Sequence, residues 1–140
     1  MTGRWYCHGD VTDLVRANAA SYLTRWTFRR MFDGCASLLS IPDFVFGQEP
    51  QQYAYNYMFR GCTGLVGTPR LPYFVDIPMM CCAGMFQGCT GLTGTPDILA
   101  DLIGTMGCMG MFRDCTGLSS AGSILTTRSE ERFSRNAETD

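Results

Sequence analysis

Apolar and polar positions along this chain recur with a nearly constant period. Met58 to Pro69 reads MFRGCTGLVGTP, and Met85 to Pro96 reads MFQGCTGLTGTP. Weaker copies run from residue 31 to 42 and from 111 to 122, so the Met-to-Met spacings are 27, 27 and 26 residues. Such a period is typical of stacked repeats, in which each unit buries its apolar positions against the next.

Aligning the four copies gives columns that stay apolar, and these columns predict the shared core. Upstream of the Met lie two bulky columns, Trp26, Tyr53, Met80, Met106 and Phe28, Tyr55, Cys82, Cys108. A downstream column holds Phe44, Leu71, Ile98 and Ile124. The predicted core ladder consists of four columns: Met31, Met58, Met85 and Met111; Phe32, Phe59, Phe86 and Phe112; Cys35, Cys62, Cys89 and Cys115; and Leu38, Leu65, Leu92 and Leu118.

Turn-forming residues separate these columns. Gly34, Gly61, Gly88 and Asp114 follow the Phe by two positions, and all four tolerate left-handed backbone. Gly64, Gly91 and Gly117 precede the Leu, where the first copy has Ser37. Proline ends the run after the Leu in three copies, so this run predicts a strand of only about three to five residues. We therefore expect each copy to hold a short parallel strand, a turn, a return loop and a helical turn around Met-Phe.

The flanks do not carry the repeat. From Asp10 onward, apolar residues fall at helical intervals (Val11, Leu14, Val15, Tyr22, Leu23 and Trp26). This pattern predicts an N-terminal helical cap over residues 1–21, and the alternative is a degenerate first repeat. The four repeats then fill residues 22–125. Residues 126–140 form a polar tail, either a short capping helix anchored by Phe133 or a disordered end.

The eight cysteines recur with the repeat, which favours a ladder of buried thiols. Disulfides and a metal site are the alternatives, and the metal site has little support because zinc ligands usually occur as closely spaced pairs. His8 is the only histidine, and no catalytic motif surrounds it. We expect no enzyme, no cofactor and no metal.

Charge and hydropathy exclude further classes. The formal charge is −2, which gives no electrostatic case for nucleic acid. No apolar run reaches the roughly 18 to 20 residues that a membrane span requires. The N-terminus has no apolar signal core, so the sequence itself encodes no secretion.

The units resemble the leucine-rich repeats of BspA-like bacterial surface proteins, whose phrase is aromatic-x-x-Met-Phe-x-Gly-Cys-Thr-x-Leu-x-x-x-Pro. The copy from Tyr55 to Pro72 fits this phrase nearly throughout, whereas Ala36-Ser37 and Gly122 depart from it. The resemblance implies a curved leucine-rich-repeat-like solenoid with a strand face. It also implies surface display or adhesion, at a cell surface or on a phage fibre, as the setting.

The residues between the repeated positions are the candidates for function. Same-column residues of neighbouring copies lie about 5 Å apart, so Asp33 with Arg60, and Asp43 with Arg70 and Asp97, predict exposed ion pairs. Aromatic and arginine side chains outside the core suit partner recognition. The binding candidates are Tyr57, Arg60, Arg70, Tyr73, Phe74 and Arg113.

These features are consistent with two functions. The first is a non-enzymatic interaction module that binds a protein or a glycan through its strand face or loops. The alternative is a structural spacer that associates with itself end to end.

Overall fold

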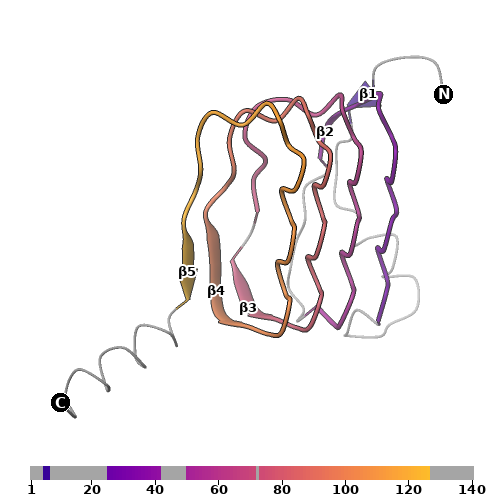
Figure 1. Ribbon diagram of the computed structural model, residues 1–140. Helices are drawn as coiled ribbons and strands as arrows, with labels where there is room; N and C mark the ends of the chain where they lie inside the picture. Colours follow the sequence, from indigo (N-terminus) through magenta and orange to yellow (C-terminus); the bar gives the residue numbers. More distant parts are fainter. Residues whose placement is uncertain (1–4, 7–24, 42–49, 72, 127–140) are drawn as a thin grey trace, which may run out of the picture.

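The computed structural model describes residues 5–6, 25–41, 50–71 and 73–126. Its strands are short: β1 is Trp5–Tyr6, β2 is Leu38–Ser40, β3 is Phe74–Ile77, β4 is Ile98–Ile103 and β5 is Ile124–Thr126. β1 pairs with β2, and β3, β4 and β5 form a second sheet in that order, with every pair parallel. Figure 1 shows the copies as coils that lie side by side.

One side of every coil is a run of consecutive turns. These turn segments, which we number 1 to 4, cover residues 25–34, 52–61, 79–88 and 105–114. Alternate backbone N–H groups bond within the coil, as Met58 N–H does to Tyr55 O at 3.1 Å. The others donate to the next coil, as Phe59 N–H does to Met85 O at 2.8 Å. Neighbouring copies are therefore joined by backbone hydrogen bonds as well as by side-chain packing.

The helical turn expected around each Met-Phe pair does not form, and the described residues contain no helix. Every fourth residue of a turn segment has positive φ, as Tyr53 (62°), Tyr57 (55°) and Gly61 (69°) show. An α-helix needs negative φ at each residue, so these left-handed residues stop it and leave alternate N–H groups to bond with the next coil. The left-handed backbone predicted at the glycine column and at Asp114 is confirmed (Gly34, Gly61, Gly88 and Asp114).

Strands occur mainly downstream of the proline positions. β2 lies in the run after the Leu, where a strand was predicted, but the equivalent runs of the next two copies make only single bridges (Gly67 with Leu92, and Gly94 with Ser120). The sheet of β3, β4 and β5 forms farther along, with Phe74 opposite Ala100 and Ile98 opposite Ile124. Pro69 and Pro96 cannot donate to a strand ladder, whereas the residues after them are rich in β-branched side chains.

The core runs through the stack as rows of similar side chains. Phe32, Phe59, Phe86 and Phe112 stack with ring centroids 5.4 Å apart at each step. In the two central copies the Met, Phe, Cys and Leu columns are at most 2% exposed (Met58, Phe59, Cys62, Leu65, Met85, Phe86, Cys89 and Leu92). Full burial of one such apolar side chain stabilises the fold by about 1.5–3 kcal/mol, so these two copies carry most of the core.

The end copies bury the same columns less completely. Met31 is 42% exposed, which corrects its place in the predicted ladder; no turn segment precedes segment 1 among the described residues. Phe32, Cys35, Phe112 and Leu118 are partly buried, whereas Leu38, Met111 and Cys115 are buried. Ile124, expected in the core, is 62% exposed, and Phe44 lies outside the described residues.

The glycines that precede the Leu make close packing between coils possible. A Cβ on Gly91 would lie 2.8 Å from Thr63 O and would collide with Leu65 O, both of the preceding copy. A Cβ on Gly64 would lie 2.9 Å from Leu38 O. In the first copy Ser37 occupies this position.

Of the predicted flanking regions, only β1 is described. Trp5–Tyr6 lies within the predicted helical cap but forms a strand beside β2, and residues 7–24, which carry the predicted helix, lie outside the described residues. The tail from residue 127 onward also lies outside them. The described part of the chain contains no helix able to cross a membrane.

Candidate functional site

Side chains of the turn segments alternate in pairs between the core and the surface. In turn segment 2, the adjacent pairs Ala54–Tyr55 and Met58–Phe59 are fully buried. The positions between these pairs lie on the side of the turn segment that faces away from the core. We call that side the outer face: positions 25, 26, 29, 30 and 33 of turn segment 1 and their equivalents in the other three. The bulky column predicted to be core lies here instead, with Trp26 and Met106 each 54% exposed.

The outer face of segments 1 and 2 holds two arginines against one tyrosine ring. The guanidinium carbon of Arg30 lies 5.6 Å from the ring centroid of Tyr57, and that of Arg60 lies 5.1 Å from it. Both distances fit cation–π contact. On the side of segment 3, the ring lies against Gly84, where a Cβ would collide with it. The tyrosine is therefore a flat support that orients two guanidinium groups.

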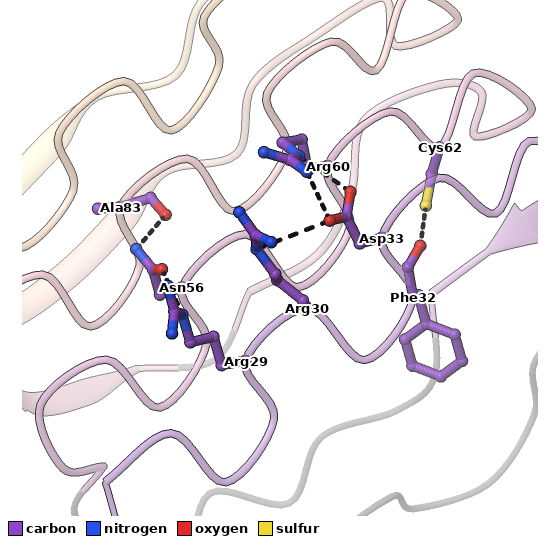
Figure 2. A network of polar contacts seen from close by, with 8 residues as sticks. All are labelled: Arg29, Arg30, Phe32, Asp33, Asn56, Arg60, Cys62 and Ala83. Carbon is purple, nitrogen blue, oxygen red and sulfur yellow. Dashed lines mark hydrogen bonds and ion pairs between the residues drawn. The ribbon is translucent and has the colours of Figure 1, made fainter.

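Asp33 fixes the second of these arginines. Arg60 donates from Nε to Asp33 Oδ1 at 2.9 Å and from Nη2 to Asp33 Oδ2 at 2.7 Å, which is a bidentate pair. These hydrogen bonds raise the pKa of Arg60 above its ordinary value. Arg30 Nε lies 3.8 Å from the same carboxylate. The predicted pairing of Asp33 with Arg60 is confirmed, and Figure 2 shows all three side chains together.

Asn56 links three neighbouring copies through its side-chain hydrogen bonds. It is 2% exposed and accepts a hydrogen bond from Arg29 Nε at 3.2 Å. It also donates to Ala83 O at 3.1 Å, so its amide is bonded on both sides. A buried amide without partners would be costly. Here the bond to Ala83 fixes the Asn56 amide, and the bond from Arg29 holds that arginine beside Arg30 (Figure 2).

The result is a basic surface with a defined geometry. Arg25, Arg29, Arg30 and Arg60 share this half of the outer face with one acid, Asp33. The guanidinium carbons of Arg30 and Arg60 lie over the Tyr57 ring, and two donors of Arg60 are bonded to Asp33. Guanidinium N–H groups that remain available can bind carboxylates, sulfates and phosphates. We call these residues, together with Asn56 and Tyr57, the arginine–tyrosine cluster.

The other binding candidates lie elsewhere. Phe74 is 1% exposed and packs in the core from β3, so its place among the surface residues is corrected. Tyr73 is 51% exposed and its hydroxyl donates to Asp101, which raises the pKa of Tyr73. Arg70 is exposed beside a shallow pocket of about 210 Å³ that Leu39, Val66 and Thr68 also line. Arg113 lies on the outer face, but in segment 4.

The second predicted ion-pair row is not observed. Asp97 accepts a hydrogen bond from Ser123 N–H at 2.8 Å, and Asp43 lies outside the described residues. Arg113 is exposed and has its nearest described carboxylate on Asp114, at 3.7 Å. Of the six binding candidates, the structure therefore brings together only Tyr57 and Arg60.

Arg29, Arg30 and Asn56 were not among the candidates predicted from the sequence. Arg30 and Tyr57 occupy the same column, so their contact follows from the repeat alone. The column does not stand out in the sequence, because it continues as Gly84 and Gly110 and its four members share no residue type.

The cysteines form a regular row inside the stack. Cys62, Cys89 and Cys115 each have Sγ 3.0 Å from the backbone oxygen of the Phe in the preceding copy. Burial raises the pKa of the Cys62 and Cys89 thiols to about 12. The seven described cysteines are free thiols, and no group of His, Cys, Asp and Glu among the described residues could hold a metal ion. Protonated, buried thiols are poor nucleophiles, so this row acts as packing.

Comparisons with protein-family models, with curated proteins and with solved structures found no match.

Proposed function

We propose that this chain is a non-enzymatic interaction module. In this proposal it is a four-copy solenoid of the leucine-rich-repeat type that binds a protein or a glycan through the outer face of its turn segments. The repeated phrase supplies a rigid scaffold, and the residues between the repeated positions supply the contacts. A cell-surface or phage-fibre setting follows only from the resemblance to BspA-like repeats.

The observation that carries the proposal is the arginine–tyrosine cluster. Arg30 and Arg60 lie on Tyr57 in the absence of any partner; Asp33 holds Arg60, and Asn56 holds Arg29 beside Arg30. Such preorganisation lowers the entropy lost on binding, because the long side chains are already fixed. Four arginines share this surface with one carboxylate, so the ion pairs within the cluster leave most of the positive charge unneutralised. Binding gives the excess positive charge a role.

The test is a binding screen with a charge-matched control. The protein is applied to arrays of proteins and glycans, and each ligand found is measured again with Arg30→Glu and with Arg70→Glu. Both variants change one exposed arginine to glutamate, but only Arg30 lies in the cluster. We expect Arg30→Glu to weaken binding by about tenfold or more and Arg70→Glu to change it little. Equal effects of the two variants, or no ligand on either array, would contradict the proposal.

End-to-end self-association has less support. It would place the last copy of one molecule against the first copy of another. β1 pairs with β2 through Trp5 opposite Leu38 and Tyr6 opposite Ser40, and Figure 1 places it at the indigo end of the stack. That edge is therefore already covered by the chain itself, as in other proteins that protect a sheet edge.

A further inference from the structure

The outer face changes character halfway along the stack. Its first half is the basic and aromatic surface of segments 1 and 2. In segments 3 and 4, four of the ten equivalent positions are methionines: Met79 is 37% exposed, Met106 54% and Met109 49%, and Met80 is partly buried. The other six positions are Ala83, Gly84, Gln87, Thr105, Gly110 and Arg113. We call the four methionines the methionine patch. Exposed, adjacent apolar side chains of this kind mark interaction sites, and methionine adapts its shape to irregular partners.

The two halves form one continuous surface. Tyr53 N–H donates to Met79 O at 3.4 Å, and Tyr57 N–H donates to Ala83 O at 3.1 Å, so the last residues of the basic half border the first of the patch. Gly84 N–H in turn donates to Met109 O at 2.9 Å. Ala83, Gly84 and Gly110 present little or no side chain between the methionines. The methionine patch is therefore a shallow apolar surface, and the arginines of segments 1 and 2 lie along one of its borders.

The far border of the patch is an open row of backbone donors. At each internal joint, N–H groups of one turn segment donate to carbonyl oxygens of the next, always in the same direction along the stack. The described residues contain no turn segment after segment 4. Among the described residues, its equivalent N–H groups have no acceptor; they belong to Met106, Cys108, Gly110, Phe112 and Asp114. Such an edge can accept the backbone carbonyls of another chain.

We propose that the outer face binds an acidic protein segment that also carries apolar side chains. This inference rests on the proposed function and names the partner class. Carboxylates of the segment would meet Arg29 and Arg30, and its apolar side chains would lie on the methionine patch. Its backbone carbonyls suit the open donor row.

A protein segment fits these features better than an acidic glycan does. A sulfated or uronic-acid glycan would satisfy the arginines, but it has no aliphatic side chains for Met106 and Met109. It also lacks a regular row of peptide carbonyls for the N–H groups of segment 4. The combination of charge and apolar surface on one face is therefore the discriminating observation.

The test uses two probes with the intact chain. A displayed library of random 16-residue peptides is selected on the protein, and heparin and polygalacturonate are measured separately as acidic glycans. Binding of the selected peptides is then compared for Arg30→Glu, Met109→Asp and, as a control on the strand face, Val75→Asp. Thermal unfolding establishes that each variant is folded, and Met109→Gln replaces Met109→Asp if the charged variant is not.

We expect the selected peptides to combine Asp or Glu with Met, Leu, Phe or Trp. Arg30→Glu and the Met109 variant should each weaken them by about tenfold or more, and Val75→Asp should not. If only the glycans bind, and Arg30→Glu weakens them, the partner class is wrong but the proposed function stands. If peptides bind and only Val75→Asp weakens them, the outer face is the wrong surface for both proposals. If neither probe binds, the protein-segment inference is overturned, and the array screen decides the proposed function separately.

Discussion

The thiol of Cys89 lies 3.0 Å from the backbone oxygen of Phe59, a residue 30 positions earlier and in the preceding copy. The same oxygen accepts the N–H of Cys62 within its own copy at 3.1 Å. The Phe59 carbonyl therefore accepts one hydrogen bond that closes a turn in its own copy and a second from the next copy. The repeated Cys is explained by this double role, since its small buried side chain carries a weak donor.

Removal of this thiol should cost more in the middle of the stack than at its start. Cys89→Ala deletes a buried sulfur and its hydrogen bond, and we expect the free energy of unfolding to fall by about 1–3 kcal/mol. Cys35→Ala is the matched control, because Cys35 is only partly buried and no described Phe of an earlier copy accepts a hydrogen bond from its thiol. Urea unfolding of both variants measures the difference. Equal losses would contradict the role assigned to the inter-copy contact.

Stability should fall in mildly alkaline solution. The Cys62 and Cys89 thiols have their pKa raised from 9.0 to about 12 by burial. Above pH 9 these thiols lose protons in the unfolded chain but keep them in the folded chain. The unfolded state then binds fewer protons, so each thiol lowers the free energy of unfolding by up to about 1.4 kcal/mol per pH unit until pH 12. Below pH 9 this contribution is fully retained.

Urea unfolding in a reducing buffer at pH 7, 8, 9 and 10 measures this dependence. The Cys89→Ser variant removes one titrating group and should show a shallower decline above pH 9. A free energy of unfolding that is constant from pH 8 to pH 10 would contradict the burial of these thiols.

Gly91 should not tolerate even a methyl group. In Gly91→Ala the new Cβ would meet the carbonyl oxygens of Thr63 and Leu65, which are backbone atoms and cannot move aside independently. We expect a loss of about 2 kcal/mol or more in the free energy of unfolding. Thr90→Ala, at the exposed neighbouring position, is the control and should change it by less than about 0.5 kcal/mol. A neutral Gly91→Ala would show that the coils are less closely packed than these contacts indicate.

The left-handed backbone at Met106 predicts an unusual order of substitutions. Met106 is 54% exposed and has φ of 55°, a conformation that costs a non-glycine residue about 1–2 kcal/mol. Met106→Gly and Met106→Ala remove the same contacts, but only glycine removes this strain. Glycine also increases the entropy of the unfolded chain, and this offsets part of the gain. We therefore expect the free energy of unfolding of Met106→Gly to exceed that of Met106→Ala by only about 0.5–1 kcal/mol. Thermal unfolding that ranks the alanine variant higher would argue against the left-handed turn.

The repeat period determined much of this structure in advance. It gave the stacking of Phe59 on Phe86 and the pairing of Asp33 with Arg60, because same-column residues must meet when copies stack. It failed for the local backbone. Two buried and two outer residues in every four resemble the 3.6-residue period of a helix, so the pattern around Met58-Phe59 predicted a helical turn. Tyr53 and Tyr57 have no residue-type signal for positive φ, unlike Gly61.

The candidate site was predicted only in part for a related reason. Tyr57 and Arg60 were identified as polar or aromatic positions between core columns. Whether Phe74 is buried depends on the register of β3 against β4, which the sequence does not give. A shift of one residue would bury Tyr73 and expose Phe74, because side chains alternate along a strand. The methionine patch was assigned to the core or left unassigned, because methionine fits a core column equally well.

Binding through the outer face can be tested by hydrogen–deuterium exchange of the complex with the tightest ligand from the peptide selection or the arrays. We predict slower exchange on binding in residues 25–34, 52–61 and 105–114, whose backbone amides lie along the outer face and its open edge. Protection confined to residues 73–77 and 98–103 would place the ligand on the strand face and would contradict binding through the outer face.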